Sequence, residues 1–271
     1  MNGDGGIDSD WVAGLLRESA ARFLLPGFRR LTATRKPDGS IVTSADLHSQ
    51  NFLQEALARR YPDIPLLGEE MTAAEQAELM RSASLLWCLD PLDGTSNYAA
   101  GVPVFGISLA LLDGQGARQG WVYDPIRDEL FTAVRGGGAF CNGERLPCKE
   151  APGLSGSVGV LDYKRLAPEL AIALVTRQPF HSQRNFGSCV LEWSWLAAGR
   201  YHFYLHGAQQ LWDWAAGGLL LQEAGGRLST LAGEPLCPNA LAKRSVLAAL
   251  DPRLHAAWST WLVTEFPKSR A

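Results

Sequence analysis

The sequence of 271 residues predicts a mixed protein in which an α+β half is followed by an α/β half. Between residues 104 and 134, strand-like runs alternate with short turns, as in an antiparallel meander. After residue 150, short apolar strands alternate with helical segments, which is typical of α/β layering. We therefore expect a soft boundary near residue 147, with residues 1–147 and 148–271 as two tightly packed halves.

The first elements expected are two helices joined by an extended segment. Apolar residues at helical spacing predict a helix over residues 8–31 that ends near Pro26-Gly27. Turn residues predict a loop at 36–40, and residues 41–46 begin as an extended segment. Residues 47–60 predict the second helix. Its buried face is expected to carry Leu47, Phe52, Leu53 and Leu57.

The remaining elements follow from runs of apolar residues between turn signals. A short strand at 66–70 ends in two acids, and a polar helix at 72–81 leads to a buried strand at 85–89. The strands of the meander are expected at 104–112, 120–123 and 129–134. Beyond the boundary we expect strands at 157–160 and 201–205, and helices at 166–177, 189–198 and 212–224.

Composition and charge are those of a globular protein. Hydrophobic residues make up 46% of the chain, charged residues 20%, and the net charge is -3. This balance predicts neither nucleic-acid binding nor attraction to a membrane surface. Apolar runs fall short of the roughly 18–20 residues of a membrane helix, and the acidic N-terminus does not resemble a secretion signal. We therefore expect a cytoplasmic protein. Five scattered cysteines without a C-x-x-C pair argue against zinc.

The most informative segment is 89–98, where Asp90 and Asp93 follow a buried strand and precede Gly94-Thr95-Ser96. Carboxylates are rarely buried unless they are paired or hold a metal. Further acids that close apolar segments or open helices are Asp46, Glu69, Glu70 and Asp213. Oxygen ligands favour Mg²⁺ or Mn²⁺ over zinc, and Mg²⁺ often bridges carboxylates to a substrate phosphate. A glycine turn into a helix offers N–H groups to such a phosphate.

Each motif alone also has an ordinary structural interpretation. A D-x-x-D pair is usually a turn or a helix cap, and Glu69-Glu70 is more often a solvated pair. Asp46 and Asp213 could be the N-caps of helices that begin at Leu47 and Trp214. The joint occurrence of these acids is what favours a site for divalent metal and phosphate.

Taken in order, the motifs resemble those of the inositol monophosphatase family over nearly the whole chain. The segments that carry the resemblance are VTSAD at 42–46, EE at 69–70, DPLDGT at 90–95, GAFCNG at 138–143, WDWAAG at 212–217 and EAGG at 223–226. The resemblance implies a layered α-β-α-β-α fold and Mg²⁺-dependent hydrolysis of a phosphomonoester. It also implies a homodimer and sensitivity to lithium.

The resemblance further implies roles for residues of this chain, most of them in the N-terminal half. Two or three Mg²⁺ ions, or Mn²⁺ in their place, would be held by Glu69, Asp90, the backbone carbonyl of Leu92, Asp93 and Asp213. Thr95 and Asp46 would activate the attacking water, and Glu70 would orient a metal-bound water. Contacts to the substrate would come from Asp93, Gly94, Thr95, Gly187, Ser188 and His206.

His206 is the main departure from the family pattern, because inositol-selective members carry a glutamate at this position. His202, Tyr204 and His206 alternate, which places them on one face of a strand. They could be ordinary polar residues of a half-exposed strand, or His206 could change the leaving-group pocket. We expect inositol monophosphate or a similar polyol phosphate as the substrate. Histidinol phosphate and 3'(2'),5'-bisphosphate nucleotides are alternatives, and a non-catalytic binding protein is a remote one.

Overall fold

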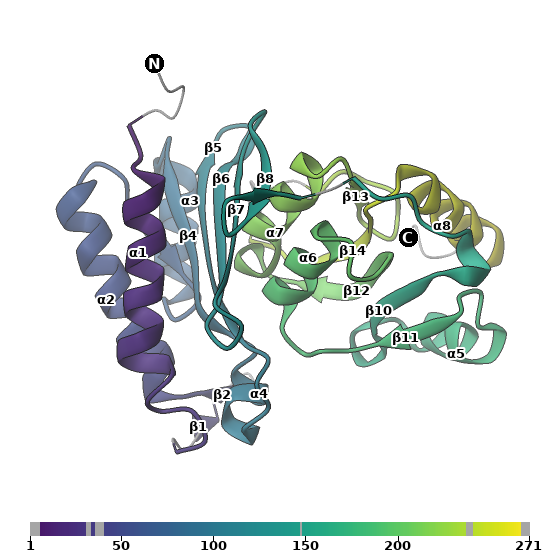
Figure 1. Cartoon of the computed structure of the whole chain (residues 1–271), viewed down its shortest axis with the longest axis horizontal. Coiled ribbons are helices and arrows are strands. Elements are labelled where there is room, and N and C mark those ends of the chain that lie inside the picture. The colour runs from purple at the N-terminus through teal and green to yellow at the C-terminus, as the bar shows by residue number, and fades with distance from the viewer. Residues whose placement is uncertain (1–5, 31–33, 36–40, 147, 237–240, 267–271) are drawn as a thin grey trace.

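The helices and sheets of the chain form five layers in the order α-β-α-β-α (Figure 1). The computed structural model describes residues 6–30, 34–35, 41–146, 148–236 and 241–266. The layered fold implied by the family motifs is thus confirmed. The loop predicted at 36–40 and the boundary residue 147 lie outside the described residues. None of the described helices has the length and apolar character needed to cross a membrane.

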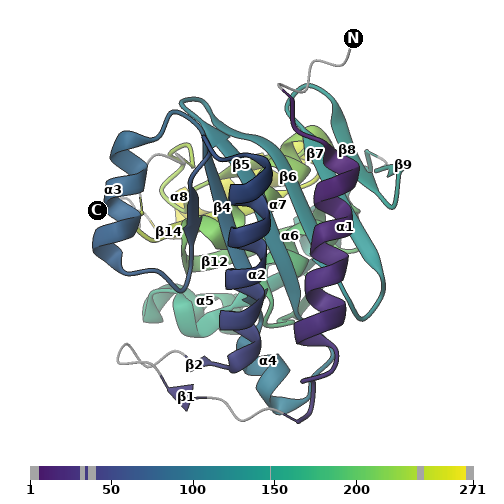
Figure 2. The same cartoon turned by 90° about the vertical axis from the view of Figure 1, so that its left-hand side faces the viewer.

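Helices α1 (Ser9–Ser19) and α2 (Ser44–Arg60) form the first outer layer and cover one face of the larger sheet (Figure 2). α1 continues as a π-helical turn over Ala20–Leu24, close to the predicted end of the helix. α2 begins at Ser44, earlier than predicted, because Thr43 caps it. Leu53 and Leu57 are buried as expected, but the placement of Leu47 was wrong, since it is 45% exposed. It lies off the helical stripe that carries the buried residues.

The second layer is a seven-stranded sheet whose strands follow the order of the chain. Its strands are β3 (Leu66–Gly68), β4 (Leu86–Asp93), β5 (Gly106–Asp113), β6 (Gly116–Asp124), β7 (Glu129–Val134), β8 (Gly138–Cys141) and β9 (Glu144–Arg145). β3 and β4 are parallel and joined by α3 (Ala73–Ser82), whereas every later pair is antiparallel. The predicted meander is therefore confirmed.

Helices α6 (Cys189–Ala197) and α7 (Leu211–Glu223) form the central layer between the two sheets (Figure 1). Their side chains share one hydrophobic cluster with the inner faces of both sheets, including Cys88 of β4 and Tyr204 of the second sheet. The two helices pack closely, because a Cβ atom on Gly217 would lie only 2.2 Å from the Cβ of Trp193. This cluster joins residues from both sides of position 147. The division of the chain there stays a prediction.

The fourth layer is a five-stranded sheet with the strand order β11-β10-β12-β14-β13. Its strands are β10 (Val158–Asp162), β11 (Ser182–Arg184), β12 (Phe203–Gln209), β13 (Arg227–Ser229) and β14 (Arg244–Ala249). Helices α5 (Pro168–Arg177) and α8 (Pro252–Glu265) cover its outer face and enclose a separate hydrophobic cluster. The short elements are β1 (Thr34–Arg35), β2 (Ile41–Val42), α4 (Thr95–Ala100) and the 3-10 turns Leu154–Gly156 and Tyr163–Arg165.

Candidate metal and phosphate site

Strand β4 carries Asp90 and Asp93 to the side of the sheet that faces α6 and α7. Leu86 and Cys88 already face that side, so Asp90 continues their alternation. Strict alternation would turn Asp93 to the opposite face. The pairing of β4 with β5 is irregular between Asp90 and Asp93, and such a bulge re-aims the following side chain. Both acids lie at the end of the buried strand, as predicted, and the strand itself continues to Asp93.

Asp213 joins these two acids from the first turn of α7. Helix α7 begins at Leu211, so Asp213 is its third residue and not its N-cap. Its Oδ2 accepts a hydrogen bond of 2.8 Å from the backbone N–H of Gln210, which holds the carboxylate in place. One carboxylate oxygen from each of Asp90, Asp93 and Asp213 lies within 4.8 Å of the others. These three residues are called the carboxylate cluster below.

Burial makes the ionised form of the carboxylate cluster unfavourable in the absence of a cation. Loss of hydration raises the pKa of Asp93 to about 6 and that of Asp213 to about 7. The pKa of Asp90 is also raised, first by burial and then by the charges of Glu69, Asp93 and Asp213. A divalent cation would relieve both effects. Because every ligand atom offered is an oxygen, the cluster suits Mg²⁺ or Mn²⁺ better than zinc.

Glu69 and Glu70 follow β3 and are half-buried at the edge of this cluster. The N–H of Glu69 donates to the carbonyl of Leu89, and the negative charge of Glu69 raises the pKa of Asp90. The N–H of Glu70 donates to Oε1 of Gln50, and its charge raises the pKa of Asp46 instead. The two neighbouring acids therefore act on different carboxylates of the site, and the separate roles expected for them stay predictions.

The hydroxyl of Thr95 contacts both Asp46 and the backbone carbonyl of Leu92. Its Oγ1 lies 3.1 Å from Oδ1 of Asp46 and 3.0 Å from the carbonyl oxygen of Leu92. Because a hydroxyl has one proton, it donates to one of these oxygens at a time and can accept from a water. Asp46 is the third residue of α2, which excludes the alternative that it is the N-cap. Its Oδ2 accepts hydrogen bonds from the N–H and the hydroxyl of Thr43. This arrangement is suited to orienting a water and taking its proton.

Gly94 makes the turn from β4 into α4. Its φ of +84° is unfavourable for other residues, and a Cβ atom there would lie 2.9 Å from the carbonyl oxygen of Val104. The N–H of Gly94 acts on the carboxylate of Asp93 and partly offsets the rise in its pKa. The contact of Gly94 with a substrate phosphate stays a prediction.

The segment of Gly187 and Ser188 leads into α6 and contacts Asp93. The hydroxyl of Ser188 donates to Oδ2 of Asp93 over 2.5 Å, and the N–H of Val190 donates to the same oxygen over 3.1 Å. The N–H of Gly187 donates to Oε1 of Glu192. The segment therefore lies beside the carboxylate cluster, where a leaving group would be expected, but its Ser188 hydroxyl is already bonded to Asp93.

His206 is buried on β12, so the interpretation as a half-exposed strand residue was wrong. Only 4% of the residue is exposed. Its Nδ1 accepts the N–H of Ala208, which leaves the proton on Nε2. Nε2 lies 3.6 Å from Oδ2 of Asp162 and 4.0 Å from Sγ of Cys189. Burial, together with the charges of Arg165 and Lys164, lowers the pKa of His206 to about 3, so its ring is neutral.

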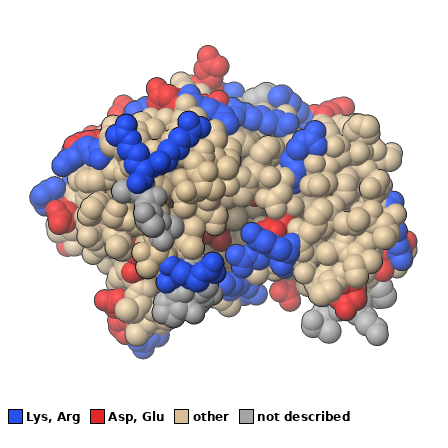
Figure 3. Space-filling model, turned by 90° about the horizontal axis from the view of Figure 1, so that it is seen from below, with Lys and Arg blue, Asp and Glu red and all other residues tan. Residues whose placement is uncertain are grey.

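Four charged residues near the site were missed in the sequence: Asp162, Lys164, Arg165 and Lys243. Asp162 pairs with His206 in adjacent strands, and the carbonyl of Arg165 packs against Gly207. The positive charges of Lys243 and Arg165 partly offset the rise in the pKa of Asp213, so they act on the carboxylate cluster. Seen from below the layers, the surface is hollowed near its centre, with acidic atoms inside and basic side chains at the edge (Figure 3). The sequence does contain one signal for this positive charge, because the basic pair Lys164-Arg165 follows a predicted strand.

Comparisons with known proteins agree with this geometry. The sequence profile of the inositol monophosphatase family matches residues 7–269. "Nus factor SuhB" of Pasteurella multocida is 36% identical over 76% of this chain and 79% of its own length. "Inositol-1-monophosphatase" of Bacillus subtilis is 32% identical over 92% of each chain. The solved Thermotoga maritima IMPase superposes with a TM-score of 0.81 at 27% identity, over 95% of this chain and 98% of the other.

Proposed function

Because the chain belongs to the inositol monophosphatase family, we propose that it hydrolyses a small phosphomonoester with the help of Mg²⁺. The observation that carries the proposal is the carboxylate cluster, whose oxygens lie within 4.8 Å of one another. The three acids come from β4 and α7, and their raised pKa values show that their ionised forms are unfavourable in this position. A bound cation would compensate for this. Mg²⁺ commonly links such carboxylates to a phosphate.

The residues fit the ions that the family motifs imply. Asp90, Asp93 and Asp213 would hold metal directly, with Glu69 and the carbonyl of Leu92 completing the set of ligands. When bound, two or three Mg²⁺ ions supply positive charge that lowers the pKa of water and balances the charge of the phosphate. Mn²⁺ has the same preference for oxygen ligands.

The attacking water would be held by Thr95. The Thr95 hydroxyl can accept a hydrogen bond while donating to Asp46, which is buried and has a raised pKa. Asp46 can therefore receive the proton that the water loses, either directly or through Thr95. Glu70, which interacts with Asp46 through its charge, would orient a second water on the same side.

The leaving group would lie against Gly187, Ser188 and His206. The neutral ring of His206 has its proton on Nε2 and can donate it to a hydroxyl oxygen of a polyol. This supports inositol monophosphate or a similar polyol phosphate as the first candidate. The second candidate is a 3'(2'),5'-bisphosphate nucleotide, because Lys164 and Arg165 near His206 would favour a leaving group that carries another anion.

A substrate panel in Mg²⁺ tests the proposal. Inositol 1-phosphate, histidinol phosphate, 3'-phosphoadenosine 5'-phosphate and fructose 1,6-bisphosphate should be compared by kcat/KM. The variant Asp93→Asn tests the metal site, because it has nearly the same shape but one negative charge fewer. It should lower turnover by orders of magnitude while the fold persists. No turnover of any of the four esters would favour a non-catalytic role.

The same proposal includes a cytoplasmic homodimer that lithium inhibits, as the family motifs imply. Light scattering on the purified chain would measure its mass. Loss of turnover in LiCl, but not in NaCl of equal ionic strength, would measure the effect of lithium. If the chain is a fully active monomer, the proposed dimer is wrong, and the proposed phosphatase activity is unaffected.

A further inference from the structure

Two polar side chains, those of Asp162 and His206, lie side by side on neighbouring strands of the five-stranded sheet. β10 and β12 are parallel, and Asp162 and His206 are partners in their register. The residues two positions earlier, Val160 on β10 and Tyr204 on β12, pack in the hydrophobic cluster of the central layer. Because side chains alternate along a strand, Asp162 and His206 both face this layer. They are called the β10–β12 pair below.

The topology of the sheet favours this place for binding. β10 lies between β11 and β12, and all three strands are parallel. After β10 the chain turns to α5 on the outer face of the sheet, whereas after β12 it enters α7 of the central layer (Figure 1). The two connections therefore part beyond the carboxyl ends of adjacent strands. In open sheets such a point leaves a crevice in which ligands bind.

The start of α6 connects the β10–β12 pair to the carboxylate cluster. Ser188 and Val190, the neighbours of Cys189 in the chain, both donate hydrogen bonds to Asp93. Sγ of Cys189 itself lies 4.0 Å from Nε2 of His206. The pair therefore lies next to the carboxylate cluster but contributes none of its three carboxylates. A site for the leaving group of a phosphate ester requires this position.

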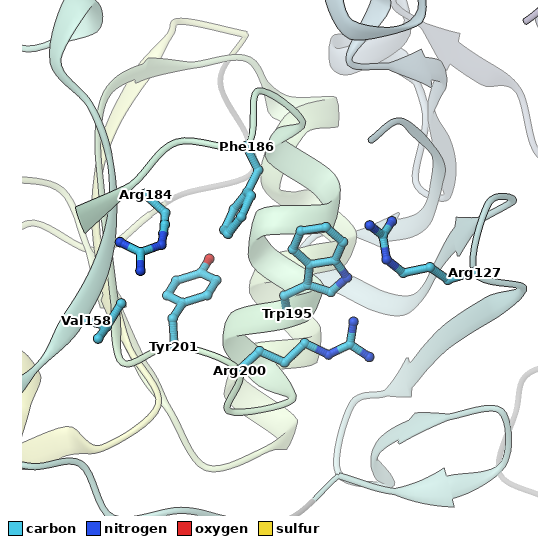
Figure 4. Close-up of a pocket in the computed structure, with 7 residues that line it drawn as sticks. All are labelled: Arg127, Val158, Arg184, Phe186, Trp195, Arg200 and Tyr201. Carbon is cyan, nitrogen blue, oxygen red and sulfur yellow. The ribbon is translucent and has the colours of Figure 1, made fainter. Parts of the chain in front are cut away.

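The pocket in Figure 4 is a different place and takes no part in this site. It is lined by Val158, the first residue of β10, and by Trp195 near the end of α6. By contrast, Asp162 is the last residue of β10, and Cys189 is the first residue of α6. The pocket and the β10–β12 pair therefore lie at opposite ends of the same elements.

The buried ring of His206 has a proton without a good acceptor. Nδ1 accepts the N–H of Ala208, so the proton is on Nε2. Among the described residues, the nearest acceptors for it are Oδ2 of Asp162 at 3.6 Å and the sulfur of Cys189 at 4.0 Å. The first distance exceeds that of a hydrogen bond, and sulfur is a weak acceptor. A donor on a residue that is only 4% exposed calls for a better acceptor.

The carboxylate of Asp162 is also available to a ligand. Its side chain is 14% exposed, and its other charged neighbour, Lys164, lies 3.8 Å away with a side chain that is 73% exposed. An ion pair of this length at an exposed lysine contributes little. Within the part of the chain that the structure describes, no hydrogen bond of normal length reaches this carboxylate. The β10–β12 pair thus offers one donor and one acceptor close together.

We propose that the β10–β12 pair binds hydroxyl groups of the leaving group and that Asp162 selects a polyol. One hydroxyl can accept from Nε2–H of His206 while it, or the hydroxyl on the next carbon, donates to Asp162. A second phosphate in this place would meet the carboxylate, so the pair favours a leaving group without another anion. This assignment, which rests on the proposed phosphatase function, adds the class of substrate to it. The acceptor is on β10, one strand away from position 206, where inositol-selective members of the family carry a glutamate.

Two esters with the same carbon skeleton test the assignment. Glycerol 2-phosphate carries a hydroxyl on each carbon next to the ester-bearing carbon, and isopropyl phosphate carries none. The ratio of their kcat/KM values in Mg²⁺ is compared between the parent chain and its variants, which cancels the different reactivity of the two alcohols. Asp162→Asn keeps the shape of the side chain but loses its charge. It should lower the preference for glycerol 2-phosphate by at least about tenfold, because a charge-assisted hydrogen bond is lost.

Two further variants accompany this comparison. Asp162→Ala removes the acceptor as well as the charge, so it should lower the preference for glycerol 2-phosphate further. Glu169→Gln removes an exposed carboxylate of α5 and should keep the preference of the parent chain. Unchanged melting temperatures show that the variants at position 162 are folded.

An unchanged ratio in Asp162→Asn and Asp162→Ala would overturn the assignment and leave the phosphatase function intact. This holds also if both kcat/KM values fall together, because Asp162 would then act only on the position of His206. Calorimetric titration of both esters in Mg²⁺ covers a chain that hydrolyses neither. Tighter binding of glycerol 2-phosphate that Asp162→Asn abolishes would then support the assignment while the phosphatase function fails. Equal binding of the two esters, or binding of neither, would overturn the assignment.

Discussion

Replacing Asp213 by asparagine separates the electrostatic cost of the carboxylate cluster from its shape. Asparagine keeps an oxygen that can accept the N–H of Gln210, so α7 retains its capping hydrogen bond. The substitution removes one negative charge from the cluster. We therefore expect two opposite effects, a loss of Mg²⁺-dependent turnover by at least about 100-fold and a gain in stability of the metal-free protein near pH 8.

The size of the gain follows from the pKa of Asp213. Burial raises it from 3.8 to about 7, so the folded chain holds a proton that the unfolded chain loses near pH 4. The stability contributed by this proton is complete below pH 4 and is lost as the pH rises through 7. A tenfold change in proton affinity is worth about 1.4 kcal/mol, and water near the half-buried side chain reduces the total. We expect about 2 kcal/mol at pH 8, or roughly 4–8 °C in Tm.

Differential scanning calorimetry in EDTA at pH 5 and pH 8 measures this effect. The two chains should melt at similar temperatures at pH 5, and the asparagine variant should melt higher at pH 8. Added Mg²⁺ should raise the Tm of the parent chain at pH 8 much more than that of the variant. Asp10→Asn, at an exposed position of α1, is the control and should change neither measurement. A variant that is less stable than the parent in EDTA at pH 8, with full turnover in Mg²⁺, would refute the reasoning.

Three further substitutions test other parts of the site and the fold. Thr95→Val should lower kcat by about 100-fold but leave the Mg²⁺-induced rise in Tm intact, because the hydroxyl lies outside the carboxylate cluster; loss of the rise would contradict this. The neutral His206, with its pKa near 3, contributes stability above pH 6.5 that is lost as the pH falls towards 3. Urea denaturation at pH 7 and pH 5 should therefore show a fall of up to about 2 kcal/mol in the parent that is smaller in His206→Gln. Gly217→Ala should lower Tm by several degrees, because the new methyl group would collide with Trp193, and an unchanged Tm would show that α6 and α7 can separate at little cost.

Local patterns were sufficient for most of the fold. Turns such as 113–114 and 124–125 separate the meander strands, and their chemistry depends only on neighbouring residues. The strands β11, β13 and β14 and the helix α8 were not predicted. β11 and β13 have three residues each, too few to show a period, and they are strands because neighbouring strands lie beside them.

The sequence by itself determined the residue types of the site and their order, and with them the family and the expected chemistry. Only the tertiary structure decided how they meet. The bulge in β4 brings Asp93 to the side of Asp90, and earlier helix starts place Asp46 and Asp213 in the first turn of α2 and α7. The bond from Ser188 to Asp93 joins residues 95 positions apart, and His206 is neutral because residues distant in the sequence bury it and place the positive charges of Arg165 and Lys164 nearby. Periodicity in a sequence reports which side of its own element a residue occupies, whereas burial and charge depend on the elements packed against it.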